Sequence, residues 1–142
     1  MPSGESNIQG SRLAPEQRNL LIERAKDALK HAYAPYSGFH VGAAVLTERG
    51  EIYAGCNVEN ASYGLTNCAE RSAICNAVAA EGARMRVRAV AVWSSPERPC
   101  APCGACRQVI FEFGPEAPVF YQDRDGVAET QARDLLPSGF RL

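Results

Sequence analysis

The order of helical and strand-like segments predicts an α/β protein, a three-layer α/β/α sandwich on a mixed sheet of about five strands. Segments with apolar residues at helical spacing are interleaved with short β-branched runs, in the order α, β, β, α, β, α, β, β. The 142 residues, 46% of them hydrophobic and 22% charged, are enough for one ordinary globular core. We therefore expect a single domain over residues 1–142, with the Ser-, Gly- and Asn-rich residues 1–12 poorly ordered.

The chain begins with a helix and a hairpin. Pro15 is a favourable first helical residue, and apolar side chains recur at helical spacing until Pro35 stops the helix. Residues 33–39 then form a loop with three aromatic rings, which we expect to fill the edge of the core. The strand-like runs 41–47 and 51–56 follow, and the short turn between them predicts a hairpin.

Two further helices enclose a strand. The first helix covers residues 68–80 and ends at Gly82. Residues 87–93 are apolar at nearly every position, which predicts a strand covered on both faces. Pro102 begins a helix that runs to about Phe113. Two strands are then expected around a turn at residues 123–126, and they cover residues 118–122 and 127–131.

Charge and composition exclude several classes of partner. A formal charge of −1, without a basic stripe, gives no electrostatic reason to bind nucleic acid or an anionic membrane. The longest apolar runs are far shorter than a membrane span. Residues 1–9 lack the basic and apolar regions of a signal peptide. We expect a cytoplasmic enzyme.

Six cysteines allow two interpretations. Three disulfides would suit a small secreted domain, but this chain is long enough to fold without them. Metal binding is favoured instead. Cys103 and Cys106 are three residues apart near a helix start, and Cys68 begins the other helix, so two helix N-termini are expected to converge on one ion. Cys56 and Cys75 are expected to be small buried hydrophobes.

Three cysteine ligands indicate a catalytic zinc, which keeps its fourth position open, whereas a structural zinc takes four protein ligands. Cys100 is the competing fourth ligand, and with Cys68, Cys103 and Cys106 it would complete a zinc knuckle. Pro102 argues against this because it marks a helix start that leaves Cys100 in the preceding loop.

Glu70 has a catalytic and a structural interpretation. Residues two apart on a helix diverge by about 200°, so Cys68 and Glu70 can share a site only if they straddle the helix start. A capping box, with Glu70 folding back on the cap, is the alternative. Because an open zinc site holds water that needs a proton acceptor, the catalytic role is favoured.

These residues resemble one enzyme family. Cys68-Ala69-Glu70-Arg71 and the segment Pro102 to Val109 resemble the zinc-dependent cytidine deaminases of the small homotetrameric branch. The resemblance extends across nearly the whole chain from about residue 20. It includes the blocks Tyr33-Ala34-Pro35-Tyr36-Ser37, Val41-Gly42-Ala43-Ala44, Gly55 to Asn60, and Leu135-Leu136-Pro137-Ser138.

The resemblance implies hydrolysis of cytidine and 2′-deoxycytidine to the uridines with release of ammonia, in pyrimidine salvage. It implies a Zn²⁺ that activates hydroxide and Glu70 as the proton shuttle. The backbone N–H of Ala69 would contact the base carbonyl. The remaining implied contacts are Asn57 and Glu59 to the ribose hydroxyls and Phe39 against the nucleoside.

The resemblance also implies supporting residues and a homotetramer with shared sites. Arg71 would offset the thiolate charge, Tyr63 would support the site, and Phe140 would close a neighbouring subunit's site. Two departures are visible: Ala101 stands where relatives commonly have Ser, and residues 62–67 lack the Pro found in some members.

Several rival functions remain. A deaminase of the same fold could act on a cytosine aminonucleoside antibiotic, although the Asn57/Glu59 pair favours ribose. Nucleotide deaminases usually carry His in place of Cys68, and a polynucleotide editor would need a basic stripe. A non-catalytic zinc-stabilised module, from another functional class, predicts four protein ligands and no need for Glu70.

Overall fold

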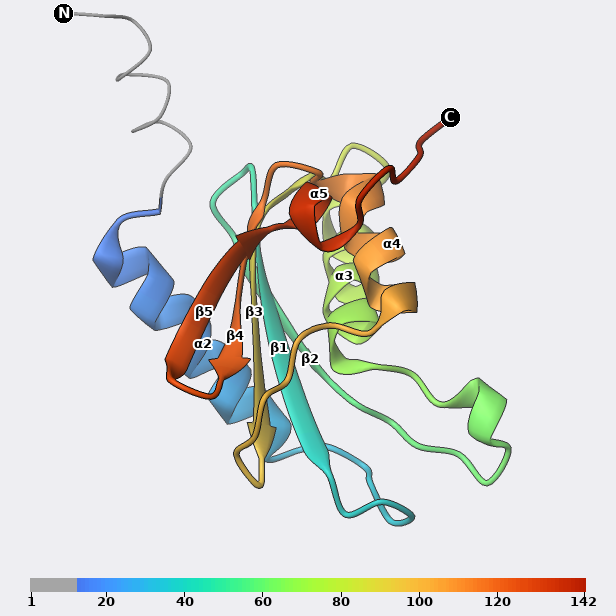
Figure 1. Cartoon of the computed structure of the whole chain (residues 1–142). Helices are drawn as coiled ribbons and strands as arrows, with labels where there is room; N and C mark the ends of the chain where they lie inside the picture. The colour runs from blue at the N-terminus through green and yellow to red at the C-terminus, as the bar shows by residue number, and fades with distance from the viewer. Residues whose placement is uncertain (1–12) are drawn as a thin grey trace, which may run out of the picture.

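The structure, a computed structural model, describes residues 13–142. The expectation for residues 1–12 lies outside this range. In chain order the elements are α2 (Pro15–Leu29), β1 (His40–Thr47), β2 (Ile52–Cys56), the 3-10 turn η1 (Tyr63–Leu65), α3 (Ala69–Glu81), β3 (Val87–Ser95), α4 (Gly104–Phe113), β4 (Pro118–Asp123), β5 (Gly126–Gln131) and α5 (Ala132–Leu135) (Figure 1).

The five strands form one mixed sheet in the order β2-β1-β3-β4-β5. β3 and β4 pair in parallel, while the other neighbouring strands are antiparallel. The hairpin of β1 and β2 aligns Val45 with Tyr53. Both the hairpin and the mixed five-stranded sheet were predicted, and both predictions are confirmed.

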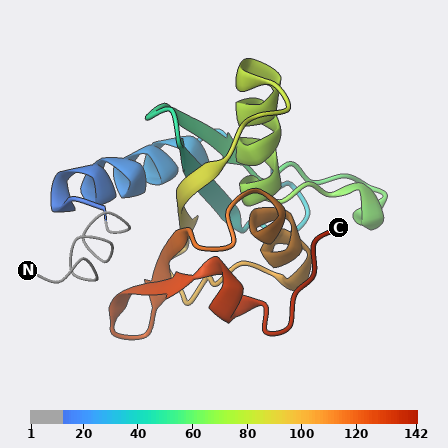
Figure 2. The same ribbon diagram turned by 90° about the horizontal axis from the view of Figure 1, so that it is seen from above.

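Helices cover both faces of the sheet, which confirms the three-layer sandwich. α2 lies on one face, and α3 and α4 lie on the other (Figure 2). Alternate residues of β3 enter the two cores: Ala89 and Ala91 join the cluster under α2, and Val90 and Val92 join the cluster under α3 and α4. This alternation explains why the strand is apolar at almost every position.

The topology fixes the edge at which a site can form. β2 and β3 are both antiparallel to β1, so their carboxyl ends lie at the same edge of the sheet. The chain leaves β2 and β3 at this edge and leads into α3 and α4. Both helices therefore begin at this edge. Open α/β sheets usually bind their ligands at the carboxyl ends of the strands.

The first helix is shorter than predicted. It ends at Leu29, before Pro35, and Leu20 remains 48% exposed. The reason is a long-range contact, since the N–H of Tyr33 donates to the carbonyl of Asn57 and Tyr33 bridges Val58 in parallel. The chain leaves the helix early to make this pairing.

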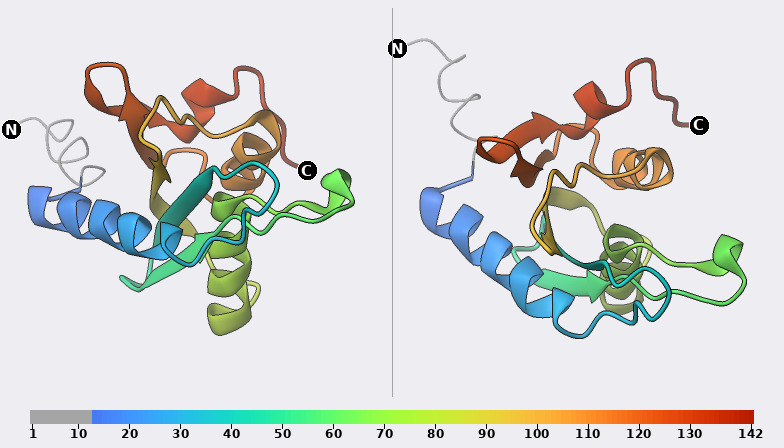
Figure 3. Two further views of the ribbon diagram at one scale, coloured as in Figure 1. Left: turned by 90° about the horizontal axis from the view of Figure 1, so that it is seen from below. Right: turned by 60° about the horizontal axis from the view of Figure 1, so that its bottom comes forward.

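Residues 33–39 form a loop, as predicted, but the prediction that its aromatic rings fill the edge of the core is wrong. Tyr33 and Tyr36 are more than half exposed, and Phe39 is only half-buried. The predicted loop after β2 contains η1, which projects from the body of the protein (Figure 3). The helix α5 was not predicted, because four residues give too short a periodic pattern to detect. Within residues 13–142, no helix is long and apolar enough to cross a membrane.

Candidate active site

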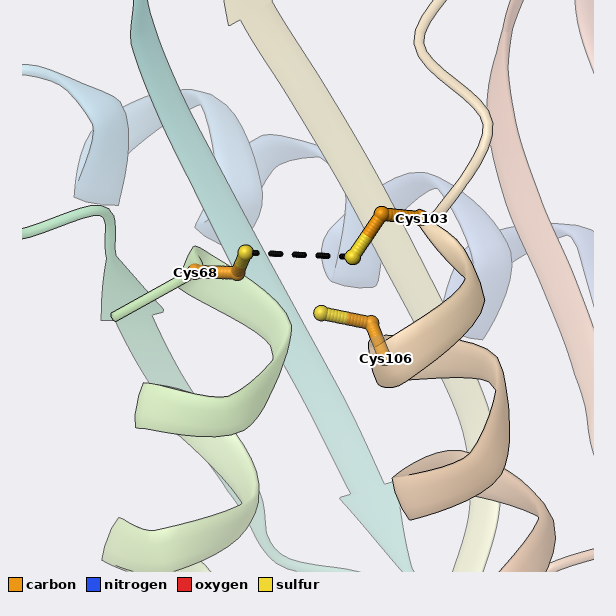
Figure 4. Close-up of side chains that lie close together, drawn as sticks. All are labelled: Cys68, Cys103 and Cys106. Carbon is orange, nitrogen blue, oxygen red and sulfur yellow. Dashed lines mark hydrogen bonds between the residues drawn. The ribbon is translucent and has the colours of Figure 1, made fainter. Parts of the chain in front are cut away.

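Three cysteine thiols meet where α3 and α4 begin. Cys68 is the N-cap of α3, Cys103 is the N-cap of α4, and Cys106 lies in the first turn of α4. The Cys68 and Cys103 sulfurs are 3.9 Å apart, and all three Sγ atoms lie within 4.8 Å of one another (Figure 4). Tetrahedral zinc with Zn–S bonds of about 2.3 Å places its sulfurs about 3.8 Å apart. The three thiols therefore fit a zinc ion.

The other cysteines lie outside this cluster. All six are free, and Cys100 is half-buried against the core, where burial raises the pKa of its thiol to about 11. Only Cys68, Cys103 and Cys106 gather among the described residues, so Cys100 adds no fourth ligand there. Cys56 and Cys75 were both predicted to be buried, but Cys56 is only partly buried, and the prediction for Cys75 is wrong. Cys75 is exposed, because it lies one position past Ile74 on α3 and turns away from the core.

Neighbouring side chains favour the thiolate form of Cys68. Its hydrogen bond with Cys106 and the nearby Arg71 guanidinium lower the pKa of the Cys68 thiol to about 5. Arg71 donates from Nη2 to the Cys68 sulfur over 3.1 Å. The neighbouring Cys68 thiol and burial raise the pKa of the Cys106 thiol. In the described part of the chain Arg71 forms no ion pair with a carboxylate.

Glu70 lies beside these thiols, in the second helical position of α3. The structural alternative, a capping box, required Glu70 in the third position, which Arg71 occupies, and no side chain caps this helix. The extended backbone of Cys68, with ψ of 155°, allows the two side chains to share one site. Glu70 is 5% exposed, and burial, with a contribution from the Cys68 charge, raises its carboxyl pKa to about 7.

Asn57 holds the backbone that carries Phe39. Its Oδ1 accepts from the N–H of Val41 over 2.8 Å, and its Nδ2 donates to the carbonyl of Phe39 over 2.9 Å. Asn57 is 8% exposed. An amide side chain has two N–H donors and two lone pairs on oxygen, so one of each remains for a ligand.

Glu59 binds the same loop. Its Oε1 accepts from the N–H groups of Tyr36 and Ser37 over 2.9 and 3.1 Å, and its Oε2 accepts from the Ser37 hydroxyl. These hydrogen bonds lower the pKa of the Glu59 carboxyl, the Ser37 hydroxyl having the largest effect. Ser37 also accepts from the N–H of Phe39 over 3.0 Å. Ser37 is not among the site residues expected from the sequence, because its partner Glu59 lies 22 positions away.

Tyr63 and Phe140, the remaining predicted residues, are not members of the thiol cluster. Tyr63 is 75% exposed and contacts the ring of Tyr36 edge-on, with centroids 6.0 Å apart. Both rings line a cavity of about 430 Å³ together with Ser37, Glu59 and Thr66. Phe140 is 68% exposed in the C-terminal tail, and its carbonyl accepts from Gln108 of α4 over 3.4 Å. Two larger hollows, of about 480 and 980 Å³, have none of the predicted site residues in their walls.

Several known proteins are similar to this chain in sequence and in fold. The profile described as the zinc-binding region of cytidine and deoxycytidylate deaminases matches residues 15–122. A cytidine deaminase of Sporosarcina psychrophila is 50% identical over 122 residues, covering 84% of this chain and 88% of that protein. One from Halalkalibacterium halodurans is 48% identical over 125 residues, covering 87% of this chain and 93% of that protein. The crystal structure of cytidine deaminase from Burkholderia pseudomallei superposes with a TM-score of 0.78 and 52% identity, covering 86% of this chain and 98% of that one.

Proposed function

The chain belongs to the zinc-dependent cytidine deaminase family, and from this membership we propose that it hydrolyses cytidine and 2′-deoxycytidine to the uridines, releasing ammonia. The observation that carries the proposal is the buried Glu70 carboxyl beside three gathered thiols at two helix starts. The reaction would serve pyrimidine salvage, in a single deaminase domain.

Cys68, Cys103 and Cys106 would hold the zinc ion as thiolates. When bound, such an ion lowers the pKa of a water molecule to about 7 and so supplies a nucleophile for C4 of the base. Arg71 offsets part of the negative charge of the three thiolates, which its hydrogen bond to the Cys68 sulfur supports.

Glu70 would move the protons of the reaction. A carboxyl group with a pKa near neutral pH can both accept and release a proton without a large energetic cost. Glu70 takes the proton of the attacking water, delivers it to ring N3, and carries another to the departing amine. The nitrogen leaves as ammonia, and the base becomes a uracil.

The nucleoside would lie between the helix start and the loop before β1. Ala69 is the first residue of α3, so its N–H has no acceptor within the helix and can bind the base carbonyl. Asn57 and Glu59 hold ribose hydroxyls with the hydrogen-bonding capacity that their loop contacts leave. Phe39 packs against the nucleoside.

A homotetramer would complete the sites. Tyr63 and Phe140 are large, apolar and mostly exposed on the single chain, which suits residues covered by a neighbouring subunit. Phe140 closes the neighbour's site, and Tyr63 supports its own. The proposed location is the cytoplasm.

Two alternatives are less favoured. A non-catalytic zinc module needs a fourth protein ligand, and the described residues offer three cysteines. A deaminase of aminonucleoside antibiotics would not need the Asn57 and Glu59 pair for an ordinary ribose.

The test compares wild type with Glu70→Gln, which keeps the size of the side chain but cannot carry the proton. We expect about one zinc per chain in both proteins, and a kcat for cytidine reduced roughly 10²- to 10⁴-fold in the variant. Glu112→Gln, which changes an exposed carboxylate of α4, is the matched control and should retain full activity. Full turnover by the Glu70→Gln protein would contradict the mechanism.

A further inference from the structure

An arginine from a distant loop covers the ring of Phe39. The Arg98 guanidinium carbon lies 3.7 Å from the ring centroid, the distance of direct stacking. Arg98 belongs to the segment between β3 and α4, and Phe39 directly precedes β1. The two segments meet because His40 pairs with Ser95 in the sheet.

Arg98 stacks on Phe39 without a polar partner of its own among the described residues. Its side chain is exposed and, among residues 13–142, takes part in no ion pair and no hydrogen bond. Ion pairs with other described residues therefore do not explain the position of the Arg98 side chain. A guanidinium is planar and stacks on aromatic faces more readily than an ammonium group.

Phe39 is fixed at its backbone but not at its ring. Ser37 and Asn57 bind its N–H and its carbonyl, as described above. The ring is half-buried and belongs to neither core cluster. Arg98 lies directly over this ring, so it can restrict the orientations that the ring adopts.

We infer that Arg98 is a positioning residue for the nucleoside: it covers one face of the Phe39 ring and holds the ring ready to pack on the substrate. The inference rests on the proposed role of Phe39. Arg98 lies in the loop that leads to Cys103, a proposed metal ligand. Its stack on Phe39 therefore connects this loop with the loop before β1.

Loss of this contact should affect binding more than chemistry. A ring free to adopt several rotamers must be ordered when substrate binds, which weakens affinity. The thiols and Glu70 have other contacts that keep them in place, so the rate of the bound complex should change little.

The experiment compares Arg98→Ala and Arg98→Lys with wild type in zinc content, cytidine kinetics and direct titration with uridine, the product. For Arg98→Ala we expect KM and the uridine Kd to rise roughly two- to tenfold, with kcat and zinc content within about twofold of wild type. Arg98→Lys should recover part of the affinity, because an ammonium group can also lie over the ring. Lys26→Ala removes a cation 4.6 Å from the Trp93 ring and is the control, which should behave as wild type.

Three outcomes would overturn the inference. Unchanged KM and Kd in Arg98→Ala would show that the ring needs no support. A lower KM would show that Arg98 competes with the nucleoside for the ring. A parallel loss of kcat and zinc would show a purely structural role. A wild-type protein that releases no ammonia would instead reject the proposed function, while uridine titration would still test Arg98.

Discussion

Among single residues, Asn57 and Glu59 support the loop before β1 through their own hydrogen bonds. Asn57 forms hydrogen bonds with the carbonyl of Phe39 and the N–H of Val41. Glu59 accepts hydrogen bonds from the N–H groups of Tyr36 and Ser37. A side chain that shapes the loop can still bind ribose, but its replacement then has two consequences. Weaker substrate use would be accompanied by a less stable fold.

Asn57→Ala tests the structural consequence. We expect it to lower the free energy of unfolding by roughly 1–3 kcal/mol, because the N–H of Val41 loses its side-chain acceptor in a part-buried position. Urea denaturation measures this loss. Asn60→Ala is the matched control: Asn60 is exposed and accepts only from the N–H of Ser62, so its removal should cost less than about 0.5 kcal/mol. Equal effects of the two substitutions would contradict the supporting role of Asn57.

At the scale of elements, the position of Cys68 depends on how closely α3 approaches β2. A Cβ atom on Gly55 would lie 2.4 Å from the backbone nitrogen of Ala73 and 2.7 Å from Cβ of Ser72. Both atoms belong to α3, the helix that Cys68 begins. Glycine at this position of β2 therefore lets the helix carry its thiol to the edge where α4 starts.

Gly55→Ala should push α3 away from the sheet. We expect a loss of roughly 1–3 kcal/mol in the free energy of unfolding, as for other overpacked sites, together with reduced zinc content because Cys68 moves with the helix. Calorimetry and metal analysis measure the two effects. Gly64→Ala, at a glycine with no heavy atom within 4 Å of the added Cβ, is the control and should change neither. Wild-type stability and zinc content in the Gly55 variant would disprove the argument.

At the scale of the whole molecule, the single chain leaves large apolar side chains uncovered. Tyr63 and Leu65 on η1 are 75% and 70% exposed, and Phe140 in the tail is 68% exposed. η1 projects from the body of the protein, so a neighbouring subunit could cover its two exposed apolar side chains (Figure 3).

The proposed homotetramer predicts a sedimentation mass about four times that of one chain. The physical reason is the burial of apolar surface that the isolated chain exposes. Phe140→Ala should raise KM for cytidine if the tail closes a neighbour's site, whereas Leu142→Ala, at the last residue, should leave it unchanged. A monomer at micromolar concentration would contradict the assembly.

Local sequence patterns are enough to predict the order of the main helices and strands, the hairpin of β1 and β2, and the set of three thiols. Helix caps, the hairpin turn and the spacing of Cys103 and Cys106 are local features, so residues close in the chain encode them. Other features become visible only in the tertiary structure. They are the end of α2, the exposure of Tyr33 and Tyr36, the raised pKa of the Glu70 carboxyl, and the arginine that covers Phe39. Each of these depends on contacts between distant segments, such as Tyr33 with Asn57 and Arg98 with Phe39. The local sequence does not encode such pairings, because they follow from the way the strands and helices pack together.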